Sequence, residues 1–182
     1  KYTRPAEFPS DEGFEAFPLQ LISPHPRFSF HTQMDGKDSF LNDIPDHRVL
    51  VNGYYYWVMR IHPDDAKARG IRENDLVRLY NERGAVICAA KLTHRMLKGV
   101  VHAYASSGVY DPVGEPGKSA DRGGCVNLLS SKKSQITKGH SMGASCCLIE
   151  VERWNAAEAA IPAREEKTQE EKKAEKRKAV AA

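Results

Sequence analysis

Residues 55–93 read YYWVMRIHPDDAKARGIRENDLVRLYNERGAVICAAKLT, and this stretch predicts most of the fold. Its first seven residues alternate between two faces in the manner of a strand, with Tyr55, Trp57, Met59 and Ile61 on one face. A proline and two aspartates follow and predict a short helix, because proline suits the first helical position and acidic side chains suit the positive end of the helix dipole. Two apolar runs separated by Asn-Glu-Arg-Gly then predict a hairpin.

The bounds of these elements follow from local signals. The helix is expected to begin at Pro63 and to stop by Gly70. The hairpin strands are expected over residues 76–80 and 85–93, and Gly84 is expected to supply the positive φ of a bulged turn.

Further short strands are expected outside this stretch, at residues 17–23, 99–105 and 147–154. Six short strands with one or two short helices predict a mainly β fold, a compact barrel, because closing the sheet removes exposed edges. The predicted core consists of aliphatic side chains from every strand: Leu19, Leu21, Val58, Ile61, Leu76, Leu79, Val86, Ile87, Val101 and Leu148.

The composition is that of one ordinary domain with some polar excess: 182 residues, net charge +3, 41% hydrophobic and 28% charged residues. No run approaches the roughly 20 apolar residues of a membrane span. The four cysteines form no CxxC pair, and two of them are adjacent, which favours a reducing compartment over a disulfide or metal framework. We therefore expect a cytoplasmic protein. Because the chain starts at Lys1, it reads as a fragment of a longer polypeptide, whose signals would lie upstream.

Composition also divides the chain into three parts. Residues 1–16 carry prolines and a glycine among acidic residues and are interpreted as an irregular lead-in or linker. Residues 17–155 form the predicted β barrel. Residues 156–182 contain no aromatic residue and are interpreted as a charged tail, helical or disordered, with a docking arm for a partner as the alternative.

Two segments have the chemistry of a polar binding site. SPHPRFSFHT, residues 23–32, offers an arginine fork, two histidines and several hydroxyls on a backbone stiffened by prolines, which could wrap a pyrophosphate or a pterin edge. Its plainer interpretation is a turn whose Arg27 and His25 satisfy backbone carbonyls. Residues 106–124 form a loop too long and too rich in Gly and Pro to be a routine connection, and the residues after it offer N–H groups, hydroxyls and cations that suit a phosphate. The glycines fit neither a Rossmann motif nor a P-loop.

The order of these phrases resembles a known family. Taken together, five stretches resemble the C-terminal molybdopterin-dinucleotide-binding domain of the dimethyl sulfoxide reductase superfamily. They are SPHPRFSFHT, residues 60–93, LKGVVHAYASSGVYDP, DRGGCVNLL and CLIEVERW. The resemblance covers residues 17–154. Within the superfamily these phrases look closest to the large subunits of transhydroxylases that interconvert trihydroxybenzenes such as pyrogallol. The chain departs from the common pattern in having His62 before the proline and Thr32 in place of Ser, and both changes keep hydrogen-bonding ability.

The resemblance implies a double-psi β barrel that binds bis-molybdopterin guanine dinucleotide, with molybdenum or tungsten ligated outside this chain. It assigns neither a catalytic residue nor a metal ligand here. The candidate cofactor-binding residues are Ser23, His25, Arg27, His31, Thr32, Gly124, Asn127, His140 and Ser141. The first five would approach one of two pterin dinucleotides, Gly124 and Asn127 would contact a pterin or its phosphate arm, and the last two would belong to the same rim.

The resemblance also implies a parent enzyme, an oxidoreductase or hydroxytransferase acting on small phenols, of which this chain alone is not catalytic. Its expected partners are the upstream domains of the same catalytic subunit and an iron–sulfur small subunit, with no nucleic acid and no membrane span. One alternative is a stand-alone β-barrel interaction module that contacts acidic partners through Lys132, Lys133 and Lys138. A weaker alternative is a nucleic-acid binder that stacks bases on the consecutive aromatics at 54–57. It is weaker because successive strand residues alternate faces, so at most two of these rings could form one stacking platform.

Overall fold

The computed structural model describes residues 7–10, 15–29, 39–105, 107–131 and 146–155, and the predicted tail at 156–182 lies outside them. The strands in the described part are β1 (Leu19–Ile22), β2 (Arg48–Val51), β3 (Tyr54–Ile61), β4 (Leu76–Asn81), β5 (Gly84–Leu92), β6 (Val100–Ala103) and β7 (Cys146–Arg153). The helices are α1 (Ser39–Asn42), α2 (Pro63–Ala68) and a 3₁₀ turn, η1 (Val126–Leu129).

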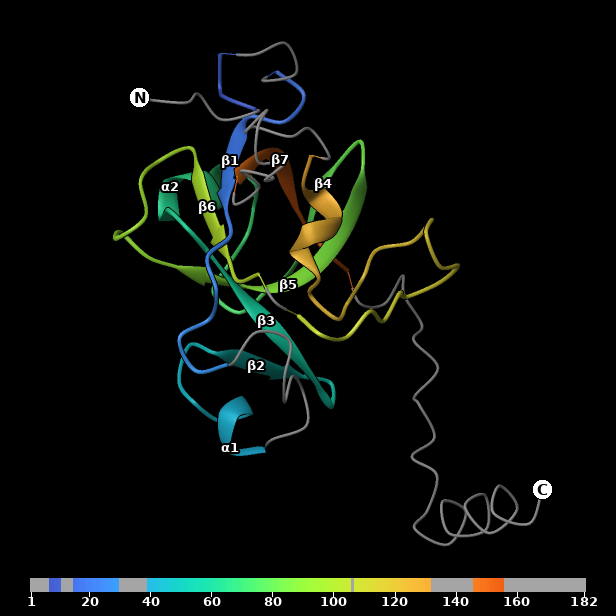
Figure 1. Cartoon of the computed structure of the whole chain (residues 1–182). Coiled ribbons are helices and arrows are strands. Elements are labelled where there is room, and N and C mark those ends of the chain that lie inside the picture. The colour runs from blue at the N-terminus through green and yellow to red at the C-terminus, as the bar shows by residue number, and fades with distance from the viewer. Residues whose placement is uncertain (1–6, 11–14, 30–38, 106, 132–145, 156–182) are drawn as a thin grey trace, which may run out of the picture.

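Six of these strands pair in a closed ring (Figure 1). The order is β3-β5-β4-β7-β1-β6, and β6 returns to pair with β3. Two of the pairings are parallel, β3 with β5 and β1 with β6, and the other four are antiparallel. The mainly β fold with a closed sheet is therefore confirmed. β2 lies outside the ring and pairs with β3.

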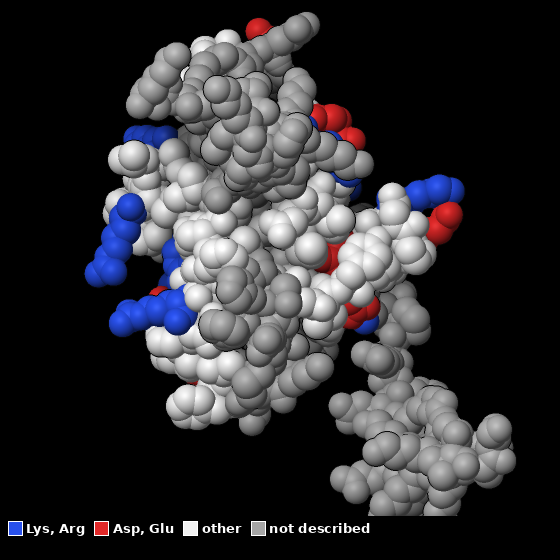
Figure 2. All heavy atoms as spheres, in the orientation of Figure 1, with Lys and Arg blue, Asp and Glu red and all other residues white. Residues whose placement is uncertain are grey.

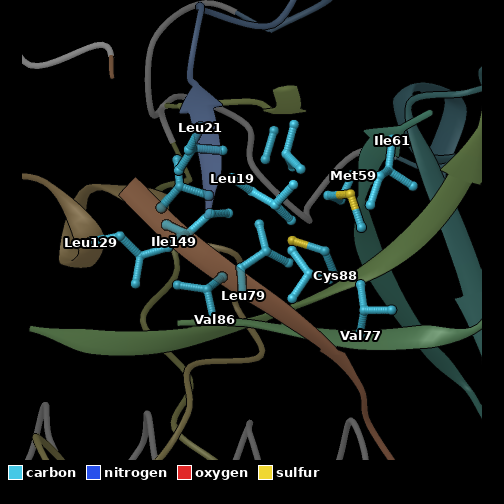
Figure 3. Packing of buried hydrophobic residues seen from close by; sticks show 14 of the residues in the cluster. Leu19, Leu21, Met59, Ile61, Val77, Leu79, Val86, Cys88, Leu129 and Ile149 are labelled. Carbon is cyan, nitrogen blue, oxygen red and sulfur yellow. The ribbon is translucent and has the colours of Figure 1, made fainter. Parts of the chain in front are cut away.

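The interior of the ring holds the main hydrophobic core (Figure 3). Leu19 and Leu21 of β1 meet Met59 of β3, Leu79 of β4 and Ile149 of β7, and all five side chains are at most 2% exposed. All ten aliphatic residues predicted for the core are buried. Burial of side chains of this size from every strand is the main favourable contribution to folding.

A second apolar cluster lies on the other face of β3, β4 and β5. Tyr56, Leu76, Ile87 and Ala89 are buried there, together with Ala120 from the long connection after β6. This connection, which the sequence marks as too long to be a routine one, pairs with β5 through Asp121, whose carbonyl accepts the Ile87 N–H at 2.8 Å. The long connection is thus part of the packed structure.

The predicted helix after β3 is confirmed. It begins at Pro63 with His62 as the N-cap, whose Nδ1 accepts the Asp64 N–H, and it ends before Gly70, which has a φ of +65°. The prediction for Gly84 is wrong, because Gly84 has no positive φ and belongs to β5, paired with Asn81 across a two-residue turn.

The hairpin formed by β2 and β3 was not predicted, although its turn carries a clear signal. Asn52 and Gly53 both have positive φ, as a tight hairpin turn requires. The strand before them is only four residues long, and it ends where this Asn-Gly pair begins.

The segment predicted as a lead-in contacts the ring. Glu7 accepts the Leu148 N–H of β7 at 2.8 Å, and its carboxylate lies 2.8 Å from the guanidinium of Arg83. In the described part of the chain, no helix has the length and apolar character needed to cross a membrane.

Candidate functional site

Two segments that the sequence selected, residues 23–29 and 121–129, are joined in space by the chain that follows β6. The carbonyl of Pro24 accepts the Ala105 N–H at 3.0 Å. Two residues later, the Ser107 hydroxyl donates to the carbonyl of Gly123 at 2.6 Å. The two segments are therefore fixed relative to one another, although about 100 residues separate them in the sequence.

Trp57 of β3 lies at the junction. Its indole is 1% exposed, and the Cβ that a side chain at Gly124 would need lies 2.2 Å from its Cδ1 atom. On another side its ring is 4.9 Å from the ring of His47, which in turn is 6.2 Å from the ring of Phe28. Trp57 thus connects Gly124 with the segment that follows β1, and Gly124 lacks a side chain because the indole fills that space.

Arg27 lies at the exposed end of this aromatic row. Its guanidinium is 5.4 Å from the ring centroid of Phe28, a distance at which a cation and a ring attract one another. Among the described residues, no carboxylate lies within 4.0 Å of it. Of its neighbours in the segment, His25 is exposed and Ser23 is buried.

The loop before η1 is organised around the carboxylate of Asp121, which is fully buried. Oδ1 accepts the N–H groups of Asp111 at 2.7 Å and Gly123 at 3.0 Å, and Oδ2 accepts that of Cys125 at 2.8 Å. A side chain at Gly123 would lie 2.1 Å from the carbonyl oxygen of Val109. The Asp-Arg-Gly-Gly sequence is therefore explained by close backbone packing around one buried acceptor.

Arg122 ties this loop to the β2–β3 hairpin. Its Nε donates to Oδ2 of Asp111 at 2.9 Å, and its guanidinium is 4.6 Å from the ring centroid of Tyr54. Burial, together with the nearby Asp111, raises the pKa of Tyr54 far above its ordinary value. The phenol is therefore a neutral, structural group.

The end of η1 is held by the β4–β5 hairpin. The Asn81 side chain donates to the carbonyls of Leu129 at 2.9 Å and Leu148 at 3.1 Å, and Arg83 Nε also donates to Leu129 at 2.8 Å. Asn127, in the middle of this turn, is exposed. The turn is thus anchored to the β4–β5 hairpin, while the predicted binding residue Asn127 remains accessible.

The electrostatics around Trp57 are cationic. The guanidinium of Arg48 is 4.2 Å from the Trp57 ring, and burial lowers its pKa to about 10, so it stays protonated at neutral pH. Burial, with a smaller contribution from Arg60, lowers the pKa of His47, so this imidazole is neutral. Figure 2 shows one face of the molecule, on which basic side chains lie mainly along the left flank and acidic ones toward the right.

The structure thus places Ser23, His25, Arg27, Gly124 and Asn127 in two connected segments. The predicted residues His31, Thr32, His140 and Ser141 lie outside the described residues. In the part of the chain that is described, no group of three or more His, Cys, Asp or Glu residues could hold a metal ion.

Four residues that organise this region were not identified from the sequence: Trp57, Asn81, Arg83 and Asp121. The sequence did carry a signal for two of them, because Asp121 stands two residues before a pair of glycines and Asn81 opens the hairpin turn. Their contacts join segments far apart in the chain, which local reasoning does not reveal.

Comparisons with known proteins identify the family of this chain. The chain is 52% identical over 139 residues to the pyrogallol hydroxytransferase large subunit of Pelobacter acidigallici, which covers 76% of this chain and 16% of that protein. It is 36% identical over 145 residues to a dimethyl sulfoxide/trimethylamine N-oxide reductase of Rhodobacter capsulatus, with the same coverage of 76% and 16%. The chain therefore spans about a sixth of the length of the relatives it matches.

Among solved structures, acetylene hydratase from Pelobacter acetylenicus is similar with a TM-score of 0.61 at 15% identity, over 85% of this chain and 21% of that one. This similarity shows a shared fold. Residues 19–146 match the family described as the molydopterin dinucleotide binding domain, a range that includes β1, Trp57 and the Asp121 loop. With more than half of its residues in that match, the chain belongs to the molydopterin dinucleotide binding domain family.

Proposed function

We propose that this chain holds the dinucleotide arms of a bis-molybdopterin guanine dinucleotide cofactor in a larger enzyme, a transhydroxylase acting on pyrogallol-type phenols. The observation that carries the proposal is Arg27, an exposed guanidinium that rests on Phe28 without a carboxylate partner among the described residues. The 52% identity to a pyrogallol hydroxytransferase large subunit supports the substrate class.

The residues around Trp57 fit such a cofactor. A pyrophosphate needs cations and N–H donors, and Arg27 can supply two parallel donors to one phosphate. The Nε1 atom of Trp57 is buried without a hydrogen-bond partner in the described part of the chain, so this region has a donor that is still unused. Asn127 supplies an exposed amide on an anchored turn, which suits the edge of a heterocycle or a phosphate oxygen.

The proposed role is binding and orientation. When bound, the metal of the cofactor supplies the centre for group transfer, and its protein ligand comes from outside this chain. The residues described here hold the far arms by charge and hydrogen bonds, and the rigid ring of strands keeps those donors in place.

Because the chain spans about a sixth of its relatives, the proposal includes the rest of the protein. The partners would be the upstream domains of the same subunit and, since one relative is named a large subunit, a smaller subunit that carries iron–sulfur clusters. We place the enzyme in the cytoplasm, in keeping with the free thiols of Cys88 and Cys125 among the described residues.

Substitution of Arg27 in the full-length enzyme tests the proposal. Arg27→Ala should lower the molybdenum or tungsten and the pterin retained per subunit, because a two-pronged charged donor to phosphate is lost. Arg27→Lys should retain an intermediate amount. Arg95→Ala is the matched control, since Arg95 is an exposed arginine in the turn between β5 and β6. Cofactor content at the wild-type level in Arg27→Ala would show that the phosphate role is wrong.

A further inference from the structure

The turn that carries Asn127 is held from two sides by two buried polar side chains. On its N-terminal side is Asp121, whose buried carboxylate accepts the Cys125 N–H at 2.8 Å. On its C-terminal side is Asn81, whose amide donates to the carbonyl of Leu129 at 2.9 Å. Between these two anchors lie the four residues of η1.

Apolar contacts fix the depth of the same turn. In a 3₁₀ helix residues three apart share a face, and Val126 and Leu129 are both buried. Asn127 and Leu128 consequently face outward, and both are exposed. The apolar pair sets which face points inward, whereas the hydrogen bonds at the two ends set where along the loop the turn begins and stops.

The chemistry at Asp121 requires a carboxylate. Its two oxygens accept three N–H groups, from Asp111, Gly123 and Cys125, and nothing in this set is an acceptor. An asparagine could accept at one oxygen, but its NH₂ group would then face another N–H. Since a buried donor without an acceptor is costly, the loop should shift to relieve it.

We propose that Asp121 and Asn81 are positioning residues that set the place of Asn127 for cofactor binding. This inference rests on the proposed function, in which Asn127 contacts the cofactor. Asp121 acts through the loop it organises, because its carboxylate is fully buried and bonded to backbone N–H groups of its own loop.

The test uses the full-length enzyme loaded with its cofactor and measures how fast the pterin dinucleotide is released, by pterin fluorescence in the filtrate. The variants are Asp121→Asn, Asn127→Ala and the double variant. Asp75→Asn is the control, because Asp75 also accepts a backbone N–H, from Arg72 at 2.9 Å, but lies in the turn before β4. Unfolding is measured for each variant, so that lost stability and faster release are separated.

If Asp121 positions Asn127, Asp121→Asn should speed release about tenfold, corresponding to about 1.4 kcal/mol, and should add little in the Asn127→Ala background. Asp75→Asn should release the cofactor at the wild-type rate even if it lowers stability. Equal effects of Asp121→Asn with and without Asn127, or an equal effect of Asp75→Asn, would overturn the inference.

Asn127→Ala alone separates this inference from the proposal on which it rests. Wild-type release by Asn127→Ala would contradict the cofactor role of Asn127 itself. Faster release by Asn127→Ala but not by Asp121→Asn would leave that role intact and refute the positioning role. If Asp121→Asn does not fold, Asn81→Ala takes its place in the comparison of single and double variants with Asn127→Ala. The Asn81→Ala change loosens the other end of the turn, while Arg83 Nε still donates to Leu129.

Discussion

The indole of Trp57 occupies the space that a side chain at Gly124 would need, with Cδ1 of the indole 2.2 Å from the position of the missing Cβ. Gly124 also has a φ of +85°, a conformation that L-residues rarely adopt. The glycine is therefore required twice, once by its backbone and once by the packing of Trp57.

Gly124→Ala should lower the free energy of unfolding by about 3 kcal/mol, since a methyl group would clash with a buried ring and hold an unfavourable φ. Chemical denaturation followed by tryptophan fluorescence measures this loss. Gly117→Ala is the matched control, because Gly117 has a φ of +81° but no atom within 4 Å of its Cβ position, and it should cost only about 1 kcal/mol. Equal losses in the two variants would contradict the packing argument.

Glu150→Gln should destabilise the fold by about 1–2 kcal/mol, because Glu150 joins β7 to the end of α2 through two bonds from Arg69. The Nε and Nη2 atoms of Arg69 donate to its two oxygens at 2.6 and 3.2 Å, and both side chains are largely buried. Glu152→Gln on the same strand is the control. Its partner Arg78 lies 3.0 Å from the Glu152 carboxylate and both groups are more exposed, so the expected loss is within about 0.5 kcal/mol. Thermal unfolding of both variants gives the comparison.

Stability should fall as the pH drops from about 6.5 toward 4, partly because of His102. Burial, with a smaller contribution from Arg60, lowers the pKa of His102 to about 4. Below pH 6.5 the unfolded chain therefore binds a proton that the folded chain does not, which favours unfolding until the pH falls below the folded pKa. After allowance for the exposed part of the ring, the expected contribution is about 1–2 kcal/mol.

His102→Gln should flatten this part of the pH profile, because it removes the titrating ring. Urea denaturation at pH 7 and pH 4.5 measures the difference for wild type and variant. His94→Gln serves as the control, since His94 is an exposed histidine. A pH profile for His102→Gln that parallels the wild type would assign the effect to other groups.

The chain expressed alone should show no hydroxyl transfer on pyrogallol-type phenols and should not retain molybdenum or tungsten in stoichiometric amount. The reason is that a cofactor enclosed between domains loses the contacts of the other wall, and with them most of its burial. Activity assays and metal analysis of the purified chain check this outcome. Robust turnover would mean that the chain is a complete catalyst.

Much of the fold could be predicted from local sequence. The strand alternation at residues 55–61, the proline–aspartate start of α2 and the apolar runs of β4 and β5 all gave elements close to those observed. Their signals depend on neighbours within a few residues. The four-residue elements α1, β2 and η1 were missed, whereas β1 and β6, which are equally short, lie within the longer stretches 17–23 and 99–105 that predicted strands.

Of the candidate site, the sequence supplied Arg27, Gly124 and Asn127 by their residue types and, above all, by the resemblance to a family. It gave no sign that a side chain at Gly124 would clash with the indole of Trp57, and the cofactor contact of Gly124 stays a prediction. Nothing local relates residue 57 to residue 124, since they become neighbours only when β3 and the long connection pack together.

Propensity and periodicity along the chain predicted six of the seven strands, the buried aliphatic side chains and the segments rich in donors. They could not predict that β6 returns to β3 to close the ring, that Asp121 gathers three N–H groups, or that Asn81 reaches the end of η1. The physical reason is that these contacts join residues brought together by burying a shared core, and their geometry depends on how all the strands pack at once.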